Sequence, residues 1–338
     1  MSFGDIALKV FKKECVFYMK QTQIGIAPRG KQRIRDRIWR DRYLYLMILP
    51  FMIWFVFMYY LPMYGILMAF QDFKIRKGIW GSEWVGFKHF VDFFANNHNT
   101  WRLIRNTLLI NVYSIVFTFP LPIILALLFD ELRSKKYKTF SQTISYMPHF
   151  ISTVVVVGLV VTMLSPSQGI VNIMLEKLGF ERIYFLVKAK YFRTIYITMG
   201  AWTSIGFSSI IYTSAISSVD ETLYEAARID GASRFQKVMH ITIPCILPTI
   251  AIMFITRIGG LLSVGSETII LLYNSSTRET ADVISTYIYR RSIEASAATA
   301  QKTYSSSAAI GLMNSFVSVL LVMIANYVSK KTTDAGLF

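Results

Sequence analysis

Long apolar runs separated by short polar segments dominate the pattern along this chain. A helix that crosses the roughly 30 Å hydrocarbon core of a bilayer needs about 20 apolar residues. Six runs reach this length and predict six membrane-spanning helices, at residues 43–70, 107–129, 144–164, 194–214, 241–262 and 307–328. The period-two alternation of a membrane β-barrel is missing. The pattern therefore predicts an all-α integral membrane protein.

Composition supports a membrane environment. Of the 338 residues, 54% are hydrophobic and 17% are charged, and the mean hydropathy is +0.44. Soluble domains carry about 25% charged residues, so this chain has too little polar surface to cover a water-soluble globule. Disordered, collagen-like and coiled-coil proteins are excluded on the same grounds.

The basic residues indicate the orientation of the chain. It carries 36 Lys and Arg against 20 Asp and Glu, a net charge of +16. Residues 1–42 and the loop Arg133–Lys136 are especially basic, and such segments face the cytoplasm. Six spans then place both termini there, including the tail 329–338. Within the first segment, Ile34 and Ile38 lie four apart among arginines, which predicts a short helix on the anionic inner leaflet. A solvated basic tail is the alternative.

The most informative segment is the loop between the fourth and fifth runs. It reads Glu225-Ala226-Ala227, then Asp230-Gly231-Ala232, and ends in Ile241-Thr242-Ile243-Pro244. Asp220 can cap a helix that begins at Glu221, and Gly231 can end or bend that helix. The small side chains let another protein approach the backbone closely. We expect an exposed elbow that docks into a cleft and transmits a push.

These residues resemble the EAA loop of permease subunits of binding-protein-dependent ABC importers. Ile241 follows Gly231 by ten residues and Pro244 follows it by thirteen, and Ile243 stands where the family usually has Leu. The resemblance implies that Glu221 to Ser233 is a coupling helix, which docks on a separate ATP-hydrolysing subunit.

The resemblance also implies a role for each motif residue. Glu225 would meet a basic group of the ATPase subunit, Ala226 and Ala227 would contact the wall of its groove, and Gly231 would form the bend. Asp230 would be a further coupling residue. The alternative is an ordinary amphipathic connector whose charges are solvated.

A wider resemblance, over about residues 40–330, implies a fold, partners and a location. Asp282–Arg290 and its neighbours are similar to the branch that takes up oligosaccharides and polysaccharides. The implied fold is that of a type I ABC importer permease in the bacterial cytoplasmic membrane. The implied partners are a second permease subunit, two subunits that carry ATP and Mg²⁺, and an extracytoplasmic solute-binding protein. The chain itself would bind no cofactor.

No segment of the sequence supports catalysis by the chain itself. Gly25–Gln32 nearly fits a phosphate-binding loop, but Gln32 stands where Ser or Thr must hold Mg²⁺, and no apolar strand precedes it. The four histidines lack metal-ligand spacing, and two cysteines make no disulfide framework. Packing explains the aromatic residues of the runs better than base stacking does. We expect no enzyme, no metal site and no nucleic-acid partner.

Polar groups within the runs are candidates for the substrate path, because such groups are costly at membrane depth. Arg257, sixteen residues into the fifth run, could clamp a carboxylate of an acidic sugar bidentately or snorkel to the outer surface. Glu267 could line the path or lie at the membrane edge. Further candidates, chosen as groups that bind sugars, are Tyr113, Trp202, Ser208, Ser209, Tyr212 and Asn314. For each of them helix packing is the alternative.

The sequence therefore favours a permease that imports an oligosaccharide or polysaccharide, acidic if Arg257 faces the path. An importer of a different solute would share these features, and the ligand of its binding protein distinguishes the two. An ion-coupled secondary carrier would need paired intramembrane carboxylates and inverted repeats, and neither is seen. A membrane-embedded enzyme would be active as the purified chain alone.

Overall fold

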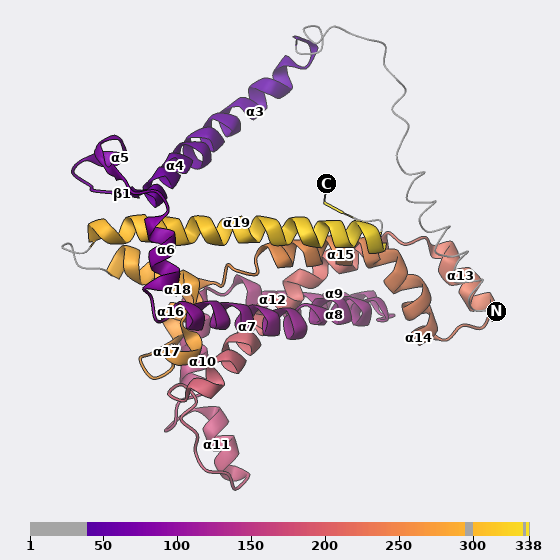
Figure 1. Ribbon diagram of the computed structural model, residues 1–338. Helices are drawn as coiled ribbons and strands as arrows, with labels where there is room; N and C mark the ends of the chain where they lie inside the picture. Colours follow the sequence, from indigo (N-terminus) through magenta and orange to yellow (C-terminus); the bar gives the residue numbers. More distant parts are fainter. Residues whose placement is uncertain (1–38, 295–299, 334–335, 338) are drawn as a thin grey trace.

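The computed structural model describes residues 39–294, 300–333 and 336–337 (Figure 1). This part of the chain is almost entirely helical. Its one sheet is a pair of short antiparallel strands, β1 (Gln71–Asp72) and β2 (Glu83–Trp84). The expected interfacial helix and the phosphate-loop-like segment lie outside the described residues, as does part of the expected C-terminal tail.

Four helical segments have the length and hydropathy of membrane spans. They are Arg42–Phe70, Thr100–Asp130, Arg234–Gly259 and Tyr304–Thr332. These segments correspond to the first, second, fifth and sixth apolar runs. A fifth is added if the pair Lys135–Phe150 and Thr153–Met163, which is bent by 97°, counts as one span. The helical, membrane-spanning character of the chain is thus confirmed, whereas length and composition do not establish six spans.

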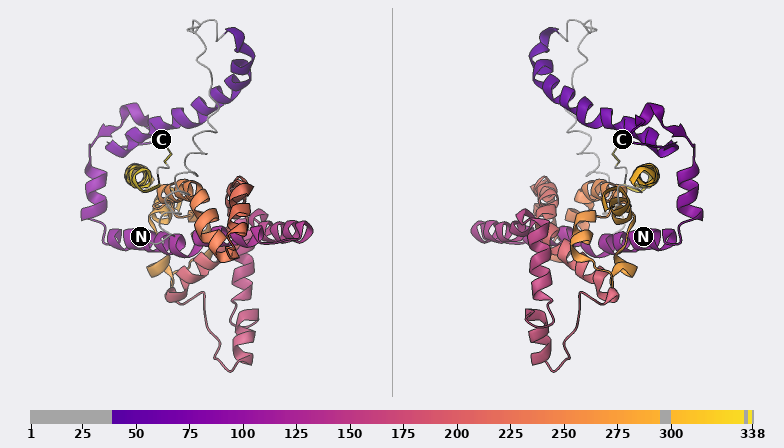
Figure 2. Two further views of the ribbon diagram at one scale, coloured as in Figure 1. Left: turned by 90° about the vertical axis from the view of Figure 1, so that its right-hand side faces the viewer. Right: turned by 90° about the vertical axis from the view of Figure 1, so that its left-hand side faces the viewer.

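The first segment stands apart from the other helices. It consists of α3 (Arg42–Phe55), η1 (Val56–Tyr60), α4 (Leu61–Met63) and η2 (Tyr64–Phe70). Pro62 has no N–H to donate, and the turn before it widens into the π-helix η1. No residue of α3 is buried, and α3 extends away from the body in Figures 1 and 2. The chain then returns to the body at η2, which packs along α19 (Ala300–Thr333).

The second segment runs almost continuously through a proline. α7 (Thr100–Thr118) and α8 (Pro120–Asp130) are joined by Phe119, whose backbone is also helical. Pro120 occupies the first position of α8, where its fixed φ fits a helix and its missing N–H matters least. α8 packs along α12 (Ala189–Ser217), the 29-residue helix that contains the fourth apolar run.

The third run differs from the prediction of one continuous span over residues 144–164. Its beginning belongs to α9 (Lys135–Tyr146), which continues through η3 (Met147–Phe150), and its remainder forms α10 (Thr153–Met163). The bend has a local cause, since Pro148 disrupts the helix and the backbone of Ser152 is extended. Alone, the 11 residues of α10 span only about 16 Å.

α12 lies at the centre of the core. A cluster of buried apolar side chains, including Ile110, Val156 and Met199, joins α12 to α7, to α10 and to α16 (Ser266–Leu272). α12 also crosses α9 closely at Gly206. A Cβ at this position would collide with the backbone carbonyl of Ser145, so the crossing requires glycine.

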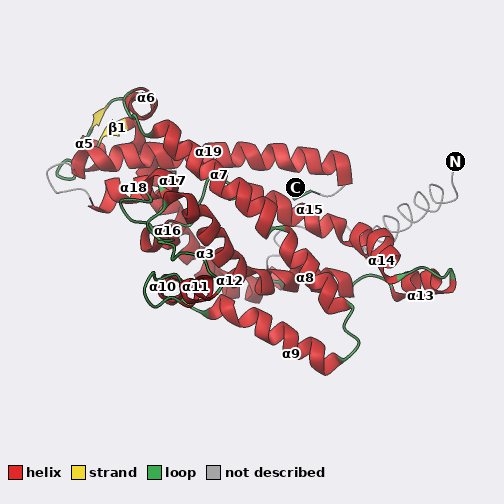
Figure 3. Cartoon of the chain, turned by 90° about the horizontal axis from the view of Figure 1, so that it is seen from below, coloured by secondary structure: helices red, strands yellow, loops and turns green. Residues whose placement is uncertain are grey.

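The remaining elements lie mainly at two opposite ends of the molecule (Figures 1 and 3). One end carries α13 (Glu221–Ile229) and α14 (Arg234–Lys237), which lead through η4 (Val238–Thr242) into α15 (Ile243–Gly259). The other end carries α5 (Gly78–Gly81), α6 (Lys88–Ala95), α16, α17 (Arg278–Ala281), α18 (Ile284–Tyr289) and η5 (Arg290–Glu294). α11 (Ile170–Lys177) projects sideways beyond α10.

Candidate functional site

The loop between α12 and α15 folds into a rigid elbow, here defined as Asp220 to Thr242. The Asp220 carboxylate caps α13 by accepting a hydrogen bond from the Thr222 backbone N–H at 3.0 Å. Hydrogen bonding by the backbone and side chain of Thr222 lowers the pKa of Asp220. α14 begins with a capping box, in which Ser233 and Gln236 each accept a hydrogen bond from the other's backbone N–H. The N-cap predicted from the sequence at Asp220 is therefore joined by a second N-cap, at Ser233.

Gly231 forms the bend between the two helices of the elbow. Its φ is +74°, a left-handed conformation that is unfavourable for residues with a Cβ. The Ala232 N–H donates back to the Ala227 carbonyl at 2.9 Å, which closes the end of α13 in the manner of a glycine C-cap.

The inner face of the elbow is fixed to the start of α15. Ala227 is buried against Ile241 and Cys245, so it contacts its own chain, whereas the sequence predicted that it faces a partner's groove. The reason is the helical period, which turns Ala227 inward while Glu225 and Ala226 face outward.

A hydrogen bond reinforces this attachment. The hydroxyl groups of Tyr224 and Thr242 lie 2.9 Å apart, and Thr242 is only 2% exposed. Thr242 closes the π-helix η4, a form of helix that often occurs at functional sites. Movement of α13 must therefore move the first turn of the following helix.

The outer face of the elbow presents two large apolar side chains that the sequence analysis missed. Ile229 is 87% exposed and Phe235 is 73% exposed, and they lie on either side of Gly231. Their signal was available as large apolar residues within an otherwise polar loop. Next to Phe235, Arg234 pairs with Glu131 at 3.6 Å, which links the elbow to the end of α8.

A second polar region lies within the helical body, where Arg257 contacts α7. Its Nη2 donates to the Ser114 hydroxyl at 2.5 Å, and Ser114 is near the middle of the segment Thr100–Asp130. α15 ends two residues after Arg257, at Gly259. Beyond this end, the Leu262 carbonyl accepts a hydrogen bond from the Asn314 side chain of α19 at 3.2 Å. Arg257 is exposed on the surface of this chain and lies two residues before the end of the apolar segment Arg234–Gly259, so its role in the path stays a prediction.

Arg193 forms a similar contact two turns further along α7. Its Nη2 donates to Oδ1 of Asn106 at 2.9 Å. The fully buried Asn106 in turn donates to the backbone carbonyls of Glu279 and Asp282, at 2.8 and 3.0 Å. We call Arg193, Arg257 and their α7 partners the arginine column. The sequence analysis missed Arg193 because it stands just before an apolar run, where an interfacial role explains an arginine equally well.

An ion-pair network holds the end of the molecule next to Arg193. Nη2 of Arg290 lies 2.7 Å from both carboxylate oxygens of Asp282, and Thr286 donates to the same carboxylate at 2.8 Å. Burial lowers the pKa of Arg290, but hydrogen bonds with Tyr273 and Asp282 outweigh it and leave the pKa raised. Arg102 approaches Asp282 at 3.9 Å. This network fixes α18 against α7.

The structure separates the other predicted path residues. Tyr113 is 39% exposed and adjoins Ser114 of the arginine column. Ser209 and Tyr212 are buried in their own chain, where Ser209 donates to the Gly206 carbonyl and Tyr212 packs among apolar side chains. Ser208 is half-buried on α12. These findings favour packing roles for Ser209 and Tyr212.

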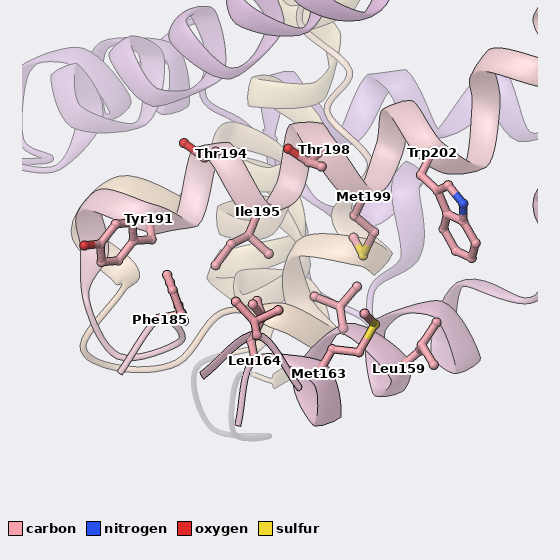
Figure 4. A pocket seen from close by; sticks show the side chains of 12 residues that line it. Leu159, Met163, Leu164, Phe185, Tyr191, Thr194, Ile195, Thr198, Met199 and Trp202 are labelled. Atoms are coloured by element: carbon pink, nitrogen blue, oxygen red, sulfur yellow. The ribbon is translucent and has the colours of Figure 1, made fainter. Parts of the chain in front are cut away.

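Two further predicted residues lie elsewhere. Glu267 is exposed in the first turn of α16, at the end of the molecule opposite the elbow. Trp202 lines a cavity of about 650 Å³ between α10 and α12. Figure 4 shows that the side chains around this cavity are almost all apolar, among them Leu159, Met163 and Ile195. Such a lining cannot satisfy the hydroxyl groups of a sugar.

Comparison with known proteins identifies the chain. The family described as "Binding-protein-dependent transport system inner membrane component" matches residues 118–334. The chain belongs to this family. It is 42% identical to protein LplB of Bacillus subtilis (strain 168) over 88% of this chain and 92% of the relative. It is 41% identical to the polygalacturonan/rhamnogalacturonan transport system permease protein YteP of the same organism, over 91% of this chain and 94% of the relative.

A solved structure agrees with the family assignment. One chain of a bacterial alginate ABC transporter, in complex with an alginate pentasaccharide-bound periplasmic protein, is 46% identical to this chain. The match has a TM-score of 0.81 and covers 90% of this chain and all of the other. This inner membrane component is therefore a permease subunit of an ABC transport system, as the motif in the elbow led us to expect.

Proposed function

We propose that this permease subunit imports an acidic oligosaccharide or polysaccharide, with carboxylate groups that pair with Arg257 and Arg193. The observation that carries the proposal is the Arg257–Ser114 contact, which holds a guanidinium that is exposed in this chain beside the middle of the apolar segment Thr100–Asp130. A charge at the centre of a membrane helix is unfavourable by about 3 kcal/mol or more unless it faces protein or a polar cavity. A carboxylate partner offsets this through charge-assisted hydrogen bonds.

The names of the relatives support an acidic substrate. One is named for transport of polygalacturonan and rhamnogalacturonan, and a second solved relative is described as importing the acidic polysaccharide alginate. Both names refer to sugar chains with a regular series of carboxylates. Arg193 and Arg257 contact α7 at Asn106 and Ser114, which are about 12 Å apart along the helix axis. Two cationic groups spaced in this way suit a polymer with several carboxylates.

The proposed topology has six spans with both termini in the cytoplasm of a bacterium. In addition to the four apolar segments, it counts the bent pair α9–α10 as one span and α12 as another. The 29 residues of α12 are about 43 Å long, enough to cross the membrane despite their Ser and Thr content. The elbow then faces the cytoplasm, and α16 to α18 face the solute-binding protein outside.

Energy enters this arrangement at the elbow. In the proposal a separate ATPase subunit receives Ile229 and Phe235 in a groove and meets Glu225 with a basic group. Closure of two such subunits around ATP and Mg²⁺ pushes the elbow, and the Tyr224–Thr242 hydrogen bond passes the push to α15. Because α15 carries Arg257, the same movement changes the position of the cationic group. A second permease subunit completes the path.

Reconstitution tests the proposal with a matched pair of ligands. The complete transporter, in vesicles with its binding protein, is supplied with an oligogalacturonide or with the fully methyl-esterified form of the same length, which is neutral. We expect ATP-dependent uptake of the charged form in clear preference. Equal uptake of both forms contradicts the proposed substrate. Retention of a non-sugar solute by the binding protein favours the alternative importer, and uptake by this chain without an ATPase contradicts the proposed mechanism.

A further inference from the structure

The cavity between α10 and α12 has no role in the proposed transport cycle. Its lining runs along α12 from Tyr191 to Trp202 and is completed by α10, by Val171 of α11 and by Phe185. Figure 4 shows Ile195 and Met199 facing Met163 and Leu164 across the space. A volume of about 650 Å³ is typical of a ligand site, but the lining excludes polar ligands.

The length of the cavity matches one leaflet of a bilayer. Tyr191 and Trp202 are eleven residues apart, which corresponds to about 16 Å along the helix axis. Half of the hydrocarbon core is about 15 Å. In the proposed topology α12 crosses the membrane and ends at the elbow, which places its other end, with Tyr191, at the opposite membrane surface. The cavity therefore extends from that surface to about the middle of the membrane.

The surface end of the cavity carries positive charge. Lys188 and Lys190 are both exposed there, and the Lys190 ammonium lies 4.8 Å from the centre of the Tyr191 ring. Within the residues that the structure describes, no ion pair joins either lysine to a carboxylate. Glu176 of α11 is paired with Arg182 at 2.8 Å. An anionic group at the mouth of the cavity would complement the two lysines.

From this juxtaposition we propose that the cavity is a lipid site, which holds an acyl chain of an anionic phospholipid and binds the headgroup phosphate through Lys188 and Lys190. The apolar lining suits the acyl chain, the length of the cavity suits the reach of that chain across one leaflet, and the two lysines suit the headgroup phosphate. The leaflet that supplies the lipid and the match to the length of one leaflet both rest on the proposed topology, whereas the apolar lining and the two lysines do not.

Photolabelling of the complete transporter tests the lipid site. The complex is reconstituted in phosphatidylcholine vesicles that contain a small fraction of phosphatidylglycerol with a diazirine in its acyl chain. After irradiation, peptide mass spectrometry locates the adducts. We expect labelling concentrated on residues 159–164 and 195–202. Even labelling of all exposed apolar helices, α3 included, would mean that lipid only surrounds the protein, and cross-links from these residues to a second permease would identify a different occupant.

Two variants and a matched control sharpen the test. Thr198→Trp fills the cavity from an exposed position on its wall, and we expect labelling at residues 159–164 to fall about tenfold. The control is Val155→Trp. Val155 is exposed on α10, the helix that carries most of residues 159–164, but lies outside the cavity, so this variant should leave labelling unchanged. Equal labelling of Thr198→Trp and the wild type overturns the proposal.

The cationic mouth is tested separately. In the double variant Lys188→Gln, Lys190→Gln, the preference for phosphatidylglycerol over a phosphatidylcholine probe with the same diazirine should fall by roughly fivefold for each lysine removed. An unchanged preference contradicts a headgroup role for the lysines. Neither measurement uses uptake, so a negative result leaves the proposed transport function intact.

Discussion

The elbow and the arginine column are built in opposite ways. The elbow consists of one continuous stretch from Asp220 to Thr242, with caps, bend and attachment residues that are neighbours in the sequence. The column takes Arg193 from α12, Arg257 from α15 and their partners from α7. The difference teaches that a motif can reveal the cap and the bend of a local structure, whereas a contact between distant helices is visible only after they pack.

The two regions also use their exposed groups differently. The elbow buries Ala227 and presents two large apolar side chains, Ile229 and Phe235, to the outside. The column presents charged guanidinium groups, and contact of such groups with lipid tails would be unfavourable. The first arrangement is suited to binding a protein groove, and the second is suited to binding an anion. Changes at the elbow should therefore affect every substrate, and changes in the column should depend on substrate charge.

The largest expected effect is that of Phe235→Ala combined with Ile229→Ala. A side chain that acts as an interface hot spot contributes about 2 kcal/mol or more, so the loss of the aromatic anchor Phe235 should lower the affinity for the ATPase subunit at least about thirtyfold, and the loss of Ile229 should lower it further. Co-purification and uptake measure the loss, which should be the same for charged and neutral sugars. Phe140→Ala, at an exposed phenylalanine of α9, serves as the control. Normal assembly of the double variant would show that the outer face does not dock.

The next effect concerns the column. Arg257→Gln should raise the KM for an oligogalacturonide about tenfold to a hundredfold, because a hydrogen bond to a charged group contributes about 1.5–3 kcal/mol. The KM for its methyl ester should change little. Arg257→Lys keeps the charge without the planar fork and should be intermediate. Equal changes for both ligands would remove the distinction between the two regions.

Tyr224→Phe tests how the elbow transmits movement. The variant keeps the ring but leaves the buried Thr242 hydroxyl without this partner, an effect of about 1–3 kcal/mol. We expect the complex to assemble normally and to import severalfold less substrate per ATP hydrolysed. A combined assay of uptake and ATPase activity in the same vesicles gives this ratio. If the ratio is unchanged, the hydrogen bond supports structure alone.

The smallest effect is expected at the bend. Gly231→Ala places a Cβ on a residue with φ of +74°, and the strain of about 1 kcal/mol should reduce uptake about fivefold. Gly231→Asn is the matched control, because Asn tolerates the left-handed conformation better than other residues with a side chain. No clash contributes, since among the described residues an added Cβ would have nothing within 4 Å. Equal losses in both variants would point to contact with a partner rather than strain.

Sequence reasoning succeeded where a local rule decides the outcome. Apolar length located the four clearest membrane segments, and the Asp220 cap and the Gly231 bend followed from single residue types. Sequence reasoning failed where two structural signals in the same segment point to different outcomes. The apolar run 144–164 is long enough for one span, but Pro148 and the extended backbone at Ser152 bend the chain by 97°. Ala227 carries a motif that suggested a partner, but its helical position turns it inward.

What the sequence by itself determined is the class of protein, its helices and its elbow, because hydrophobic length, capping and glycine conformation depend on residues within a turn or two of each other. What only the tertiary structure decided is which polar groups meet at depth. Arg257 and Ser114 are 143 positions apart in the sequence, and the same arginine could have faced water, lipid or protein. Packing of α7, α12 and α15 brings Arg257 to Ser114 and leaves Ser209 and Tyr212 buried.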